Sequence, residues 1–223
     1  DDGSVKLWNL ETGEEIYVFN TQAYQVRSLA FSPDGNLLAI GNSVAKVWNV
    51  ATGEEVYSFP LGPFAYTRMV FTPNGQFLAL ATYDGIDLWD VKTGRKARTF
   101  PSTGRPWSFA FSPKGDLLLV VDEGGCRLWD MKSGNQIWTF KAQPPVSFSP
   151  DGQWIVAGSP GDEGALSLWN LKTREEYYTF SKGHIEHIAF SADGRFLVLL
   201  RDTGTSREAV EVWNWRLLKT LEK

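Results

Sequence analysis

Leu7-Trp8-Asn9 is the first of six copies of one tripeptide, in which a Leu or Val, a Trp and an Asn or Asp follow one another. The other five copies are Val47-Trp48-Asn49, Leu88-Trp89-Asp90, Leu128-Trp129-Asp130, Leu168-Trp169-Asn170 and Val212-Trp213-Asn214. Successive tryptophans of this set are 40, 41, 40, 40 and 44 positions apart. A period near 40 residues indicates a supersecondary unit that is repeated along the chain.

Two kinds of turn recur in phase with the tripeptides. The first reads Ser32-Pro33-Asp34-Gly35, and its further copies are Thr72-Pro73-Asn74-Gly75, Ser112-Pro113-Lys114-Gly115, Ser149-Pro150-Asp151-Gly152 and Ser191-Ala192-Asp193-Gly194. Pro presets φ at the second position and Gly accepts a positive φ at the fourth, which favours a type I turn that closes a β-hairpin. The second reads Thr12-Gly13 and recurs as Thr52-Gly53, Thr93-Gly94 and Ser133-Gly134, whereas the fifth copy is Thr173-Arg174.

Short runs rich in β-branched and aromatic residues lie between these turns, for example 26–31, 37–40, 45–50 and 55–59. Since no window keeps apolar residues at helical spacing, the sequence predicts an all-β chain. Each full unit should hold four antiparallel strands: position a before the Pro-Gly turn, b after it, c with the Trp, and d after the Thr-Gly turn. A single sheet cannot bury both faces, so radially stacked sheets, a β-propeller, are the predicted fold.

The combination of these turns and tripeptides resembles the WD-repeat (tryptophan-aspartate) β-propeller family over essentially the whole chain. The resemblance implies a structural role for the strand-c tryptophans Trp8, Trp48, Trp89, Trp129, Trp169 and Trp213, and for His184, because only Gly183-His184 matches the family's Gly-His dipeptide. Most units lack the His, Asp and Ser or Thr that hydrogen-bond with the Trp in that family. We therefore expect apolar packing around the indole rings, each burying on the order of 200 Å², to stabilise the units.

The sequence predicts one propeller domain over residues 1–223. Its units are a half unit, 1–20, with strands c and d only, and five complete units, 21–60, 61–100, 101–140, 141–180 and 181–223, the last with its own strand d at 217–221. Strand c of the half unit would have an unpaired edge, which folded sheets normally cover. We therefore expect either a longer chain that supplies strands a and b or a partner chain that does so.

Composition argues against several classes of partner. The chain has 22 Lys and Arg against 26 Asp and Glu, a net charge of −4, and no basic run longer than two residues, so neither nucleic acid nor an anionic membrane is an expected partner. No apolar stretch approaches the ~20 residues that a transmembrane helix needs. The single cysteine, Cys126, can form neither an internal disulfide nor a thiolate metal site; it is compatible with an intracellular, reducing compartment and leaves the location open.

Few residues are candidates for chemistry. The two histidines, His184 and His187, would need carboxylates from elsewhere to hold a metal, and Asp122-Glu123 and Asp162-Glu163 are too few ligands for calcium. No Gly-x-Ser-x-Gly and no local Ser-His-Asp arrangement occurs. We therefore predict no catalytic residue, no metal and no cofactor. The alternative is an enzyme or metal-binding propeller whose site lies at the mouth of the central channel.

Surface recognition is the predicted function: a noncatalytic interaction scaffold or ligand-sensing module. In a propeller the d–a and b–c loops share one rim, and the d–a loops are the least repetitive segments of this sequence. Aromatic and Arg side chains dominate binding hot spots. We therefore expect a protein or peptide to bind this rim, and the predicted contact residues are Tyr24, Phe64, Tyr66, Arg105 and Trp107. The alternative for each ring is that it packs between blades or fills the channel.

Overall fold

The computed structural model describes most of the chain and divides it into two compact units, Asp1–Arg105 and Pro106–Lys223. The described residues are 3–21, 26–41, 44–60, 68–160, 164–180, 185–191, 193–202 and 208–218. The division between these two compact units falls close to the boundary that the sequence predicts between the repeats 61–100 and 101–140. One domain over residues 1–223 remains a prediction.

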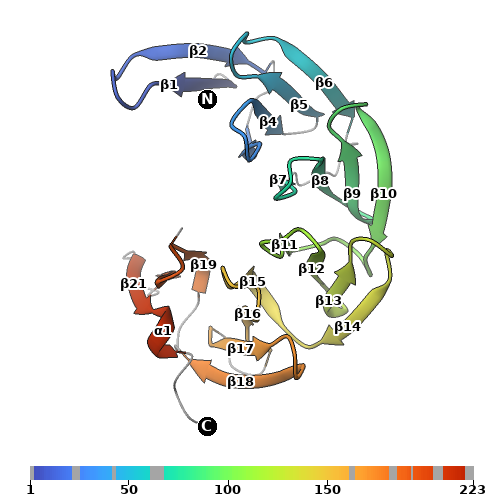
Figure 1. The fold of residues 1–223 in the computed structure, drawn as a ribbon, viewed down its shortest axis with the longest axis vertical. Helices are drawn as coiled ribbons and strands as arrows, with labels where there is room; N and C mark the ends of the chain where they lie inside the picture. The colour runs from blue at the N-terminus through green and yellow to red at the C-terminus, as the bar shows by residue number, and fades with distance from the viewer. Residues whose placement is uncertain are drawn as a thin grey trace. The chain divides into compact units, whose positions relative to one another are not determined.

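The first unit contains a two-stranded hairpin and two four-stranded antiparallel sheets, with neighbouring strands in chain order (Figure 1). The hairpin consists of β1 (Ser4–Trp8) and β2 (Glu15–Asn20). The sheets consist of β3 (Ser28–Phe31), β4 (Leu37–Gly41), β5 (Val44–Asn49) and β6 (Glu55–Pro60), and of β7 (Met69–Phe71), β8 (Phe77–Thr82), β9 (Gly85–Asp90) and β10 (Arg95–Pro101).

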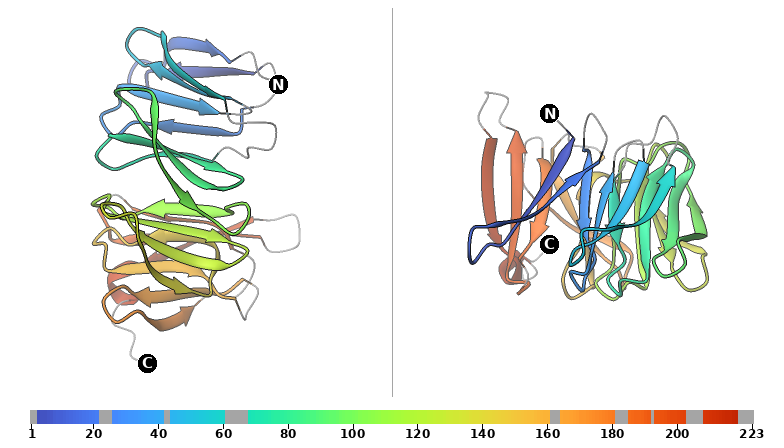
Figure 2. Two further views of the ribbon diagram at one scale, coloured as in Figure 1. Left: turned by 90° about the vertical axis from the view of Figure 1, so that its right-hand side faces the viewer. Right: turned by 90° about the horizontal axis from the view of Figure 1, so that it is seen from above.

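The second unit contains two four-stranded sheets and one three-stranded sheet, all antiparallel (Figure 2). The four-stranded sheets are β11 (Ser108–Phe111), β12 (Leu117–Asp122), β13 (Gly125–Asp130) and β14 (Gln136–Phe140), and β15 (Gln143–Phe148), β16 (Trp154–Gly158), β17 (Leu166–Asn170) and β18 (Glu175–Phe180). The three-stranded sheet is β19 (Ile185–Phe190), β20 (Phe196–Asp202) and β21 (Glu208–Asn214), followed by the single helical turn α1 (Trp215–Leu218).

The all-β class and the four-stranded antiparallel blades of the prediction are confirmed, but the last unit differs. Leu217 and Leu218 lie in α1 rather than in the predicted strand d at 217–221, and residues 219–223 lie outside the described part. The other c–d turns need a residue with positive φ, as at Gly13 and Gly53, and Asn214-Trp215-Arg216 is not followed by Gly. Four described sheets are therefore complete, instead of the five predicted.

The residue after each strand-c Trp closes the c–d turn. The Oδ1 atom of Asn9 accepts hydrogen bonds from the backbone N–H groups of Glu11 (2.8 Å) and Thr12 (3.1 Å), and the Gly13 N–H bonds to the Asn9 carbonyl. Asn49, Asp90 and Asn170 accept the corresponding pairs of bonds. Short Asn and Asp side chains suit this local capping, so the recurrence of these residues after Trp has a backbone cause.

The a–b turns are closed by hydrogen bonds of their first residue, whose hydroxyl donates to a nearby Asp or Asn side chain and accepts a backbone N–H. The Ser32 hydroxyl donates to Asp34 (2.5 Å) and accepts from the Leu37 N–H (2.9 Å), while the Gly35 N–H donates to the Ser32 carbonyl (2.9 Å) at a φ of 73°. The same Ser contacts recur in the turns at Ser149 and Ser191. In each of the five predicted hairpin turns the Gly N–H donates to the carbonyl of the first residue, as the Pro-Gly pattern indicates; residue 192 of the last turn lies outside the described residues.

Within each unit the core lies between consecutive sheets, where a Phe of strand d packs on the Trp of the next sheet. Ring centroids are 5.5 Å apart for Phe19 and Trp48, and 4.6 Å apart for Phe59 and Trp89 and for Phe140 and Trp169. The indole N–H groups of Trp48, Trp89 and Trp169 are buried and have no hydrogen-bond partner among the described residues. At these three positions the indole therefore contributes by packing rather than by a polar network.

The residue two positions before each of the six strand-c tryptophans is polar, and its side chain contacts an oppositely charged or hydrogen-bonding group. Lys6–Glu15 (2.7 Å) and Lys46–Glu55 (2.8 Å) are at least partly exposed, and Lys96–Asp87 (3.0 Å) joins an exposed Lys to a buried Asp. Such pairs contribute little to stability. The exception is Arg127–Asp122, because both side chains are buried within the sheet of β11–β14.

Candidate partner-binding rim

Three of the five predicted contact residues, Tyr24, Phe64 and Tyr66, lie outside the described residues, and so does His184. Arg105 is half-buried at the end of the first unit. Trp107 is the second residue of the second unit; half of its surface is exposed, and its backbone N–H donates to the Val121 carbonyl (2.8 Å). These five contact positions therefore remain predictions.

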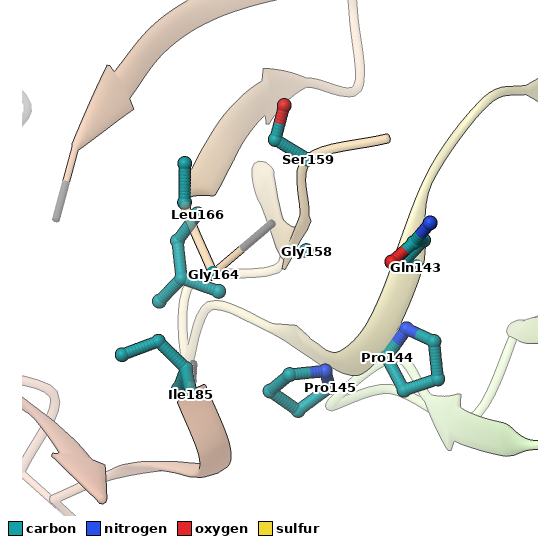
Figure 3. A pocket seen from close by; sticks show the side chains of 9 residues that line it. Gln143, Pro144, Pro145, Gly158, Ser159, Gly164, Leu166 and Ile185 are labelled. Carbon is teal, nitrogen blue, oxygen red and sulfur yellow. The ribbon is translucent and has the colours of Figure 1, made fainter. Parts of the chain in front are cut away.

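The second unit has a pocket of about 240 Å³ at the end of its sheets where the d–a and b–c connections lie (Figure 3). It opens where β15 and β19 begin and where β16 passes to β17. The residues that line it are Gln143, Pro144, Pro145, Gly158, Ser159, Gly164, Ala165, Leu166 and Ile185. The pocket lies beside the d–a and b–c connections that the sequence predicts to be the recognition surface, but Gly158, Leu166 and Ile185 are strand residues next to those connections.

A local irregularity of β15 shapes the pocket. Gln143 pairs with Gly158, but the next pair is Val146 with Ala157, so Pro144 and Pro145 stand outside the regular ladder. Prolines carry no N–H group to donate to β16, which favours such a bulge. A Cβ atom at Gly158 would lie 2.6 Å from the Pro144 carbonyl oxygen and 2.8 Å from that of Gln143, so only glycine allows this approach.

The pocket has an apolar floor and a partly polar edge. Ala165, Leu166 and Ile185 are buried, and Leu166 and Ile185 belong to the same core cluster although they come from neighbouring sheets. Gln143 and Pro144 are exposed, and Ser159 is half-exposed, with its N–H donating to the Ala165 carbonyl (2.8 Å). Figure 3 shows Pro145 and Ile185 along one side of the pocket and Ser159 on the opposite side. The volume is below the roughly 300 Å³ of sites for drug-sized ligands.

The described residues contain no group of three or more His, Cys, Asp or Glu placed to hold a metal ion. His187 is exposed on β19, and Asp162-Glu163 lie outside the described residues. The buried Asp122 carboxylate is paired with the Arg127 guanidinium and accepts the Gly124 N–H (2.8 Å). Burial, and secondarily the charge of Asp122, raise the pKa of the Cys126 thiol, which keeps it protonated and a poor nucleophile.

Sequence reasoning placed recognition on the d–a and b–c loops but missed the pocket residues Gly158, Ser159 and Ile185. Two signals were available: adjacent prolines at the start of a predicted strand, and a glycine at the end of the strand that pairs with it. Neither signal indicates a cavity by itself, because the third wall, Ile185, comes from the next sheet.

The family model described as WD domain, G-beta repeat matches residues 13–49, 94–130 and 134–170. Each match begins at the Gly of a c–d turn and ends at the Asn or Asp after a strand-c Trp. No curated protein matches the chain. Among the described residues, no helix is long and apolar enough to cross a membrane.

WD repeats generally mediate protein–protein interactions as scaffolds and are generally noncatalytic. With three matched segments in phase with six structural repeats, this chain belongs to the WD-repeat family of β-propeller proteins.

Proposed function

We propose that this chain is a noncatalytic scaffold that binds a protein or peptide through the rim formed by its d–a and b–c connections. The observation that carries the proposal is the pocket between Pro144-Pro145, Ser159 and Ile185, because it lies on that rim. Its apolar floor can take one aliphatic side chain, while Gln143 and Ser159 can hydrogen-bond the backbone on either side of it.

The rim also offers anchoring groups outside the pocket. Trp107 in the same unit is half-exposed immediately before β11, and half-buried Arg105 ends the first unit. Trp and Arg contribute a large contact area per residue in protein interfaces. The predicted residues Tyr24, Phe64 and Tyr66 are proposed as further contacts on the d–a loops.

A random peptide library displayed on phage and selected on the 223-residue chain tests the proposal. The test variant is Ser159→Phe, which places a ring in the pocket, and the matched control is Gln153→Phe, which adds a ring to the exposed a–b turn at the opposite end of the same sheet. Fluorescence anisotropy of the selected peptides should show at least tenfold weaker binding to Ser159→Phe and unchanged binding to Gln153→Phe. If the selected peptides bind Ser159→Phe as tightly as Gln153→Phe, the pocket is not their binding site.

A further inference from the structure

The outer strand β10 carries the opposite charge to the outer strands of three other sheets. Where a c–d turn passes into β2, β6 or β18, the sequence has a pair of glutamates: Glu14-Glu15, Glu54-Glu55 and Glu175-Glu176. Arg95-Lys96 takes the same repeat positions at the start of β10, and the segment 92–98 contains four basic residues and no acidic one. We call these four residues the basic segment: Lys92, Arg95, Lys96 and Arg98.

Most of the basic segment is open to solvent. Lys92, Arg95 and Lys96 are exposed, and Arg98 is half-buried. Lys96 pairs across the strands with Asp87 (3.0 Å), so the sheet itself accounts for this one cation. Within the part of the chain that the structure describes, neither Lys92 nor Arg95 forms an ion pair. These two cations therefore have a charge that the fold does not use.

The two carboxylates closest to the basic segment in the sheet serve local structure. Asp90 closes the c–d turn, because it accepts hydrogen bonds from the backbone N–H groups of Lys92 (3.1 Å) and Thr93 (2.8 Å) and from the Thr93 hydroxyl (2.9 Å). Asp87 accepts the Thr99 hydroxyl (2.6 Å) in addition to its ion pair. An acidic group that binds the basic segment would therefore come from outside this sheet.

The position of β10 in its sheet leaves one edge open. The strand order is β10-β9-β8-β7, so no described strand pairs with the outer edge of β10 (Figure 1). An extended peptide can add to such an edge through backbone hydrogen bonds. Charged side chains normally protect edge strands from unwanted pairing, and the glutamates of β2, β6 and β18 can do this. The same glutamates would repel an acidic strand that the basic segment attracts, so the reversed charge selects an acidic partner.

We propose that β10 binds an acidic peptide segment of a partner protein, which lies extended along the outer edge of this strand. Its carboxylates meet Lys92 and Arg95 at the c–d turn, the end of the sheet opposite to the d–a and b–c connections. The proposal thus goes beyond the proposed function and adds a second contact surface. A nucleic acid is disfavoured, because Phe100, the one aromatic residue of β10, is buried and offers no ring for a base to stack on.

Fluorescence anisotropy with a labelled decapeptide of alternating Glu and Thr tests the proposal on the 223-residue chain. The test variant combines Lys92→Ala with Arg95→Glu. It gives the turn the residues that the sheet β3–β6 has at the same positions, so folding should be retained, which circular dichroism checks. The matched control combines Lys132→Ala with Lys172→Glu, which changes the net charge by the same amount at exposed c–d turns of the second unit.

The peptide should bind the unaltered chain and the control equally well, and the test variant at least about fivefold more weakly, because two exposed ion pairs are lost and one repulsion is added. Binding should also weaken as salt is added. A peptide that does not bind the unaltered chain would overturn the proposal. Equal losses in the test variant and the control would do the same, because net charge alone would then explain the binding.

Two further measurements separate this surface from other sites. Ser159→Phe, which fills the rim pocket, should leave binding of the acidic peptide unchanged; a loss there would place the peptide in the pocket and overturn the proposal. A labelled oligothymidine of ten nucleotides should bind more weakly than the peptide. Tighter binding of the oligothymidine that is lost in the test variant would make the basic segment a nucleic-acid site instead.

Discussion

Gly53 and Gly94 lie in c–d turns that are packed against a Tyr ring of the preceding sheet. Gly13 lies in the same kind of turn, with no described atom close to it. All three glycines have φ between 65° and 71° in c–d turns. A Cβ atom at Gly94 would lie 2.5 Å from the Cδ1 and Cε1 atoms of Tyr57, whose hydroxyl donates to the Lys92 carbonyl (2.7 Å), and no described atom lies within 4 Å of a Cβ at Gly13. Alanine at these positions therefore separates backbone strain from packing.

The expected costs follow from these distances. Gly13→Ala should lower the free energy of unfolding by about 1 kcal/mol, because only the left-handed backbone conformation opposes it. Gly94→Ala adds overpacking of a ring that its hydrogen bond holds in place, which costs typically a further 1–3 kcal/mol. In a Tyr57→Ala background the ring is absent, so the cost of Gly94→Ala should fall to that of Gly13→Ala.

Urea unfolding followed by far-ultraviolet circular dichroism measures these differences, provided that the slope m is the same for all variants. Equal costs for Gly13→Ala and Gly94→Ala would refute the reasoning. The same conclusion would follow if removing Tyr57 left the cost of Gly94→Ala unchanged, because the contact with the preceding sheet would then contribute nothing.

Three further predictions concern single residues. Arg174 takes the glycine position of its c–d turn at a φ of 60°, so Arg174→Gly should raise the free energy of unfolding by about 1 kcal/mol in the same urea assay. Asp122→Ala removes the carboxylate that faces buried Arg127 and should cost about 3–5 kcal/mol, whereas Lys6→Ala, which breaks an exposed pair, should cost under about 1 kcal/mol; similar losses in melting experiments would contradict this ranking. Hydrogen bonds from Ser191 and the Arg195 N–H lower the pKa of Asp193 from 3.8 to about 2, so its stabilising contribution is complete above pH 4 and is lost as the pH falls toward 2. Asp193→Asn should therefore melt with a weaker dependence on pH over that interval than the unaltered chain.

The sequence predicted the sheets because their signals are local. The turn at Ser32–Gly35 and the cap at Asn9 use residues within five positions of one another, and the Trp spacing fixes which turns belong to one unit. Where a local signal was missing, the prediction of the last strand d was wrong: the residues after Asn214 contain no glycine for the turn, and the chain enters a helical turn with Trp215 buried.

The pocket could not be predicted from the sequence because its walls come together only in three dimensions. Pro144 leaves the ladder of β15, Gly158 permits the close approach from β16, and Ile185 arrives from the following sheet, about 40 residues after Pro144. The exposure of Val212 could not be predicted from the sequence either. Its tripeptide is of the same type as the five others, and it differs from them only in having no described sheet packed against it.

The hydroxyl groups of Tyr17 and Tyr57 donate to the carbonyls of Ala51 and Lys92, so the outer strand of one sheet is tied to a turn of the next. These ties join successive repeats and span no more than one boundary. A mutation that destabilises one repeat should therefore destabilise the adjacent repeat as well, as in a linear array, and should affect more distant repeats less. When the repeat at one end of the first unit is destabilised, the repeat at its other end should be the last to unfold.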